Sequence, residues 1–151
     1  MQKHYSKRPL FIDLFAGCGG LSLGLEQSGF VPILVNELNK DAMNTYLMNR
    51  KEFSWLNEFK TNDVKDLTKE IKKIKNLKSN FFNQIENKFD ISFSKGDLDL
   101  IAGGPPCQGY SGIGHRRNYG VDRVKIPANK LYEDMAKLII ALKPKIFLFE
   151  N

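Results

Sequence analysis

Short runs of apolar residues alternate along the chain with polar segments in which apolar residues recur at helical spacing. The continuous runs are typical of buried strands. We expect strands at residues 9–15, 31–36, 98–102 and 145–149, and a weaker one near residues 59–61. The spacing elsewhere predicts helices at residues 42–47, 68–78 and 129–142, and a short helix that ends near Gly29.

Strands that alternate with helices indicate a parallel sheet joined by right-handed crossovers. Because the apolar runs have no polar face, we expect helices to cover both faces of the sheet. The pattern therefore indicates an α/β fold. Asn39 or Asp41 can cap the second helix, and Pro144 ends the last one. The lysines of residues 68–78 form either a solvated helix face or a phosphate-binding surface.

The composition narrows the class of protein. The chain has 151 residues, of which 42% are hydrophobic and 26% charged, so one domain with a packed core is expected. The net charge of +6 favours a polyanionic partner such as nucleic acid. No apolar run is long enough to span a membrane, and the two cysteines make no disulfide framework, which favours the cytoplasm. The two histidines have no ligand partners, so we expect no metal.

Glycines separate the first strand from the first helix at Gly17, Gly19 and Gly20. Such a turn brings backbone N–H groups close to a ligand, although Ser22 replaces the third glycine of the dinucleotide-binding pattern. Glu37 ends the second strand, where a carboxylate can bind the ribose hydroxyls of an adenosine. Asp63 follows the third strand, and it either caps a turn or binds the adenine amino group.

A rigid turn, Gly-Gly-Pro-Pro-Cys-Gln-Gly-Tyr-Ser at residues 103–111, follows the fourth strand. Cys107 lies in this turn, and it is either a nucleophile at the end of a parallel strand or a small residue in a tight loop. The following loop, residues 109–125, carries arginines that either hold phosphates or are solvated.

Five segments together resemble the cytosine-5 DNA methyltransferase family. Residues 11–20 are similar to its first motif, and residues 105–108 to its fourth. The second, third and sixth motifs are matched by Asn36-Glu37 with Ala42, by Asn62-Asp63-Val64 and by Phe149-Glu150-Asn151. The resemblance implies a Rossmann-like methyltransferase fold, here incomplete. It implies that residues 1–151 are the N-terminal part of the catalytic domain.

The resemblance also implies S-adenosylmethionine as the cofactor. The residues expected to line its site are Phe15, Ala16, Gly17, Gly19, Gly20, Glu37, Leu38, Asp63, Val64 and Pro106. Cys107 would attack carbon 6 of a cytosine flipped out of double-stranded DNA. Glu150, if partly buried, would protonate N3, and Asn151 would orient the loop or the base. DNA contacts are expected from Gln108, Ser111, Arg116, Arg117 and Arg123.

The family has an arginine-containing motif, a target-recognition domain and two final motifs that we do not find in this sequence. We therefore expect either a fragment or one half of a split enzyme, completed by a second chain, from a bacterial restriction–modification system. Two other functions fit the same residues. The chain could methylate transfer RNA, or it could be a non-catalytic truncated module that binds S-adenosylmethionine or a partner.

Overall fold

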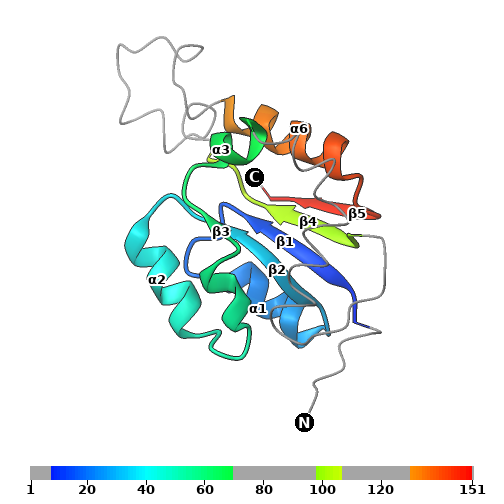
Figure 1. Cartoon of the computed structure of the whole chain (residues 1–151). Helices are drawn as coiled ribbons and strands as arrows, with labels where there is room; N and C mark the ends of the chain where they lie inside the picture. Colours follow the sequence, from blue (N-terminus) through cyan, green and yellow to red (C-terminus); the bar gives the residue numbers. More distant parts are fainter. Residues whose placement is uncertain (1–7, 70–97, 107–129, 151) are drawn as a thin grey trace.

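The computed structural model describes residues 8–69, 98–106 and 130–150. These residues form a five-stranded sheet in the order β3-β2-β1-β4-β5, in which each strand runs parallel to its neighbours. The strands are β1 (Leu10–Leu14), β2 (Val31–Asn36), β3 (Lys60–Thr61), β4 (Leu100–Gly103) and β5 (Ile146–Phe149). Their carboxyl ends therefore lie along one edge of the sheet (Figure 1). The predicted α/β fold with a parallel sheet is confirmed.

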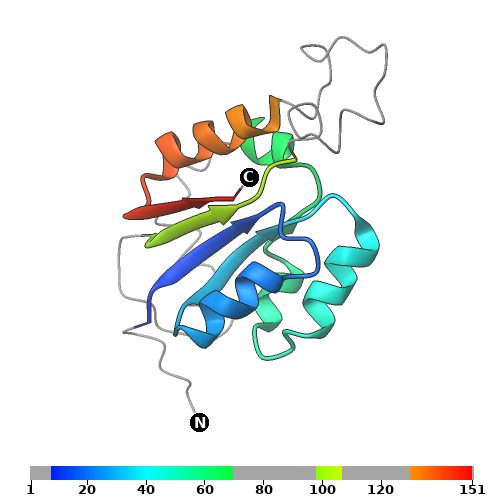
Figure 2. The same cartoon turned by 180° about the vertical axis from the view of Figure 1, so that it is seen from behind.

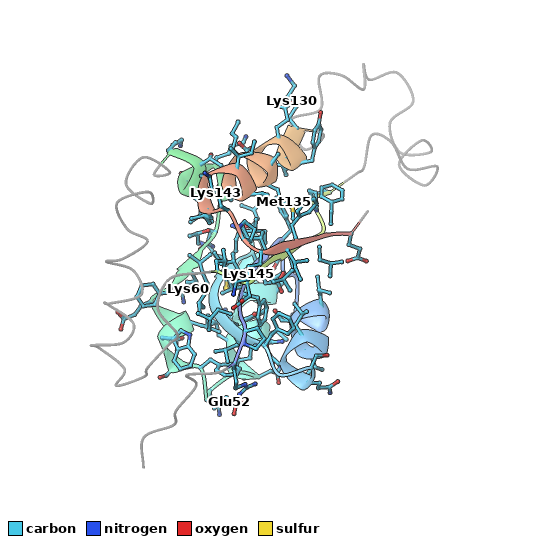
Figure 3. The ribbon with its side chains drawn as sticks, turned by 90° about the vertical axis from the view of Figure 1, so that its right-hand side faces the viewer. Glu52, Lys60, Lys130, Met135, Lys143 and Lys145 are labelled. Carbon is cyan, nitrogen blue, oxygen red and sulfur yellow. The ribbon has the colours of Figure 1, made fainter. Side chains whose placement is uncertain are left out.

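Helices lie on both sides of this sheet. They are α1 (Gly20–Gln27), α2 (Lys40–Met48), the 3-10 helix η1 (Ser54–Asn57), α3 (Val64–Lys69) and α6 (Leu131–Leu142). Figures 1 and 2 show α1 and α2 on one side, and α6 with α3 beside it on the other. In Figure 3, Lys130 and Lys143 mark the two ends of α6, and the buried Met135 lies on the side of the helix that faces the sheet.

Alternating side chains of the central strands face the two helical layers. On one face, Phe11 and Leu100 are buried beneath Leu21 and Leu25 of α1. On the other face, α6 packs against the sheet through two buried side chains, those of Met135 and Leu138. Removal of these apolar side chains from water is the main stabilising contribution to the sheet, at about 25 cal/mol per Å² buried.

The strand β5 departs from the prediction that all strands are covered. Ile146, Phe147, Leu148 and Phe149 are between 41% and 63% exposed. β5 lies at the edge of the sheet and pairs with β4. Among the described residues, α1 covers the central strands but leaves the apolar surface of β5 open. The strand itself was predicted correctly, but its burial was not.

Two helix starts are set by polar side chains. The side chain of Asn39, rather than that of Asp41, caps α2, because its oxygen accepts hydrogen bonds from the N–H groups of Asp41 and Ala42. α3 (Val64–Lys69) follows Asp63 and begins before the helix predicted at residues 68–78. Residues 70–78 of that predicted helix, with their lysines, lie outside the described residues. No helix within the described ranges is long and apolar enough to cross a membrane.

Candidate functional site

The strand order places two predicted sites next to each other. Strands β1 and β4 are neighbours, with Leu14 opposite Gly103 at their carboxyl ends. From β1 the chain continues to β2 and β3 on one side, whereas β4 and β5 lie on the other. Open α/β sheets bind ligands at such a switch point, beyond the carboxyl ends of the strands. The residues predicted for the cofactor and for catalysis follow these strand ends.

The turn after β1 has the unusual backbone that a ligand-binding turn requires. Phe15, Gly17 and Gly19 have φ values of 59°, 57° and 91°. A phenylalanine in the left-handed region is strained, and such strain is concentrated at functional sites. The turn is held to β2 because the N–H of Ala16 donates to the carbonyl oxygen of Asn36 at 3.0 Å.

Glu37, which directly follows β2, is hydrogen-bonded to the same turn. Its Oε2 accepts a hydrogen bond from the N–H of Gly17 at 2.7 Å, and its Oε1 accepts one from the N–H of Asn39 at 2.7 Å. Each carboxylate oxygen has a second lone pair, so the group can still accept hydrogen bonds from a ligand. The next residue, Leu38, has an apolar side chain that is 70% exposed at this edge.

The N-terminus of α1 lies at the carboxyl ends of the strands and is accessible there. Gly19 is its N-cap residue, and no side chain of the described part of the chain caps the helix. Gly20, which begins the helix, has open space where a β-carbon would be. The first N–H groups of a helix carry a partial positive charge and bind anionic groups.

Asp63 has the cap role that the sequence left open. Its Oδ1 accepts a hydrogen bond from the N–H of Lys65 at 2.9 Å, at the start of α3. Val64 is only 3% exposed and belongs to the hydrophobic core. The side chain of Val64 is therefore directed into the protein, which leaves only its main chain for a ligand.

Glu150 lies beside the turn that follows β4. Its N–H donates to the carbonyl oxygen of Gly103 at 3.0 Å, and its Oε2 is 3.3 Å from the position of a β-carbon on Gly104. The structure thus brings the glutamate and the Gly-Gly-Pro-Pro turn together, as predicted. Glu150 is exposed and not partly buried, because it follows the edge strand β5. Pro106 is also exposed.

Several predicted site residues lie outside the described ranges, and their roles stay predictions. They are Cys107, Gln108, Ser111, Arg116, Arg117, Arg123 and Asn151.

Beneath the glycine turn lies a buried chain of hydrogen-bonded polar side chains that the sequence pattern does not predict. The Ser22 hydroxyl donates to Oδ2 of Asp13 at 2.5 Å and lies 2.7 Å from the Tyr46 hydroxyl. Because a serine hydroxyl has one proton, the tyrosine donates to the serine. The other oxygen of Asp13 has no hydrogen-bond partner among the described residues. Burial raises the pKa of Asp13 to about 6, against the lowering effects of Ser22 and Arg50.

Arg50 extends this chain from the end of α2. Its Nε donates to Oε1 of Glu26 at 2.6 Å, and its Nη2 donates to the carbonyl oxygen of Gly19 at 2.7 Å. Its guanidinium lies 3.8 Å from the centroid of the Tyr46 ring. Tyr46 was predicted as an apolar helix position. Ser22 stands where the dinucleotide-binding pattern has its third glycine, and this departure was the one feature of the sequence that pointed to these buried polar contacts.

Comparisons with known proteins show the family of the chain. A model of the C-5 cytosine-specific DNA methylase family matches residues 10–151. The type II methyltransferase M.DdeI of Desulfomicrobium norvegicum is 34% identical over 93% of this chain, which is 27% of that protein. M.PspPI of a Psychrobacter species is 36% identical over 93% of this chain, which is 26% of that protein. The chain thus spans about a quarter of the length of these relatives.

A solved structure supports the fold assignment. The crystal structure of a protein named as a DNA modification methyltransferase of an Escherichia coli prophage matches with a TM-score of 0.60 and 31% identity. The match covers 93% of this chain and 31% of that protein. The Rossmann-like methyltransferase fold expected from the motifs is confirmed. The chain belongs to the C-5 cytosine-specific DNA methylase family.

Proposed function

We propose that this chain is the N-terminal part of the catalytic domain of a DNA cytosine-5 methyltransferase of a restriction–modification system. It would act in the cytoplasm and transfer a methyl group from S-adenosylmethionine to carbon 5 of a flipped cytosine. The main support for the proposal is the position of two turns at neighbouring strand ends. The glycine turn after β1 and the Gly-Gly-Pro-Pro turn after β4 follow paired strand ends, at Leu14 and Gly103.

The residues around the glycine turn fit S-adenosylmethionine. The N-terminus of α1, which no described side chain caps, suits the carboxylate of its methionine part. Glu37 has lone pairs left for the ribose hydroxyls, and the exposed side chain of Leu38 offers an apolar face to the adenine. Phe15, held with a φ of 59°, borders the same turn. When bound there, S-adenosylmethionine supplies a methyl group activated by the sulfonium.

The catalytic step needs an activated cytosine, because carbon 5 is a weak nucleophile. The thiolate of Cys107 forms a bond to carbon 6, and N3 takes a proton from Glu150 as the ring electrons shift. The resulting enamine is nucleophilic at carbon 5. Carbon 5 would take the activated methyl group as that group's bond to sulfur breaks. A solvent base would then remove the carbon-5 proton, the thiolate would leave carbon 6, and N3 would return its proton to Glu150.

The position of Glu150 beside Gly103 and Gly104 supports its role. Its side chain is exposed among the described residues, so the proposal requires the flipped base and the rest of the methylase to bury it.

The exposed strand β5 supports the further proposal that more polypeptide completes the sheet. Ile146 pairs with Leu100 and Leu148 with Ala102, and Leu100 and Ala102 belong to the cluster under α1. An apolar surface that continues beyond α1 is suited to a further packing element. The occupant we propose is the rest of the methylase, in the same chain or in a second one, which the relatives' greater length supports.

Nucleoside analysis after methyl transfer tests the proposed function. The methylase that contains this chain is incubated with methyl-labelled S-adenosylmethionine and with DNA or transfer RNA. We expect 5-methylcytosine in the DNA and no label in the RNA. Label in transfer RNA alone would identify an RNA methyltransferase, and label in neither, with S-adenosylmethionine bound, would identify a non-catalytic module. Either result contradicts the proposal.

A further inference from the structure

Arg50 is a buried cation that contacts the glycine turn from behind. It is 5% exposed, and its three donor nitrogens reach three different parts of the chain. Nε reaches Glu26 of α1, Nη1 the carbonyl oxygen of Tyr46 in α2 at 3.2 Å, and Nη2 that of Gly19 in the turn. A planar guanidinium can make these three hydrogen bonds at the same time, whereas the single ammonium group of a lysine cannot reach all three acceptors.

The packing between Arg50 and the turn is tight. A β-carbon on Gly19 would lie 2.5 Å from Nη1 of Arg50 and 2.7 Å from Cδ2 of Tyr46. The guanidinium also stacks on the Tyr46 ring, and the Tyr46 hydroxyl is bonded to Ser22 of α1. The turn is thus held between Glu37 on one side, through Gly17, and Arg50 on the other, through Gly19.

The charges around Arg50 explain why such a buried cation is tolerated. Glu26 forms an ion pair with it at 2.6 Å, in which both side chains are largely buried. Asp13 is a second carboxyl within its electrostatic reach. Removal of one partner of a buried pair leaves the other charge uncompensated, so the arginine and its acids act as one unit.

We propose that Arg50 is a positioning residue for the cofactor site: it fixes the carbonyl of Gly19, and so the direction of the first N–H groups of α1, which no described side chain caps. This inference rests on the proposed function, because it concerns how the chain binds S-adenosylmethionine. Arg50 itself bonds to the turn and to helices α1 and α2, and it is assigned no contact with the cofactor. Its effect is on the geometry of the donors that the cofactor meets.

The test compares Arg50→Lys and Arg50→Met with Lys51→Met. Lys51 is the next residue and is exposed, so its variant controls for loss of a positive charge. The affinity for S-adenosylmethionine and the Michaelis constants for S-adenosylmethionine and DNA are measured in the complete methylase. Hydrogen exchange of the peptide containing residues 16–24 reports the order of the turn directly.

We expect Arg50→Lys to weaken S-adenosylmethionine binding about tenfold, because charged hydrogen bonds to Gly19 and Tyr46 are lost. The Michaelis constant for DNA should stay unchanged, and exchange in residues 16–24 should accelerate. Lys51→Met should match the wild type in all four measurements. A variant that was merely less stable would not raise the Michaelis constant for S-adenosylmethionine while leaving that for DNA unchanged. If Arg50→Met does not fold, Arg50→Lys decides the result.

Two outcomes would count against the inference in distinguishable ways. Wild-type affinity in Arg50→Lys, with unchanged exchange of the turn, overturns the positioning role and leaves the proposed function intact. Failure of the wild-type methylase itself to bind S-adenosylmethionine overturns the proposed function, and the positioning role with it.

Discussion

Gly19 and Arg50 are packed so closely that a β-carbon at position 19 would force the Arg50 or Tyr46 side chain to shift. A β-carbon there would lie 2.5 Å from Nη1 of Arg50, and the φ of Gly19 is 91°. We expect Gly19→Ala to lower the free energy of unfolding by about 2–5 kcal/mol, from backbone strain and overpacking together. Urea unfolding followed by circular dichroism measures the change.

Gly24 is the matched control for this substitution. It lies within α1, where a β-carbon would meet nothing within 4 Å. Gly24→Ala should leave stability unchanged or raise it by about 1 kcal/mol, because alanine is the better helix former. Equal effects of the two substitutions would show that the contact with Arg50 does not constrain the turn.

The carboxylate of Glu37 should matter for cofactor affinity. Glu37→Ala removes the acceptor for Gly17 and Asn39, together with the proposed acceptor for the ribose. We expect binding of S-adenosylmethionine to weaken about tenfold or more by calorimetry. Asp41→Ala is the control, since Asp41 is an exposed acid in the first turn of α2. Unchanged affinity in folded Glu37→Ala would remove Glu37 from the site.

Asp13 should make stability depend on pH. Burial raises its pKa from 3.8 to about 6, so the folded state binds this proton more tightly than the unfolded state does. The stabilisation from the bound proton is present below pH 4 and is lost as the pH rises to about 6. Relative to Asp13→Asn, the wild type should lose about 2–4 kcal/mol of unfolding free energy across this range.

Urea unfolding of both proteins at several pH values measures this difference. Glu26, whose pKa is also raised by burial, titrates in both proteins and therefore cancels. A wild type that gains stability over Asp13→Asn as the pH rises would mean that Asp13 is stabilised as the anion.

The periodicity of the chain predicted the strands and the glycine turn because these depend on local sequence. Leu10–Leu14, Val31–Asn36 and Leu100–Gly103 are mainly apolar and form the buried centre of the sheet. β5 has the same pattern but is exposed. An apolar pattern indicates that a strand will be buried in the complete protein. It does not indicate which residues cover the strand.

The polar chain beneath the turn could not be predicted in the same way. Asp13, Ser22, Tyr46 and Arg50 come from β1, α1, α2 and the segment after α2, and only the folded chain brings them together. Tyr46 has helical spacing with apolar residues, so its hydroxyl was not expected to bond to Ser22. Asp63 caps α3 through its bond to Lys65, and its predicted contact with the adenine amino group stays a prediction.

The open surface of β5 gives a further prediction. Ile146 is 63% exposed. In the isolated 151-residue chain, Ile146→Lys should therefore reduce self-association and the binding of a dye that reports exposed apolar surface. In the complete methylase the same variant should impair folding, because it would place a charge in a packed layer. Sedimentation and thermal unfolding measure the two effects. A complete methylase that tolerates Ile146→Lys would contradict the proposed covering of β5.

Covalent trapping of DNA tests the central claim most directly. A duplex with 5-fluorocytosine at the target site is incubated with S-adenosylmethionine and the complete methylase, because fluorine at carbon 5 cannot be eliminated as a proton is. We predict a covalent protein–DNA adduct that maps to Cys107 by mass spectrometry and is absent in Cys107→Ser. An adduct that persists in Cys107→Ser, or none with an enzyme that methylates normal DNA, would contradict the account.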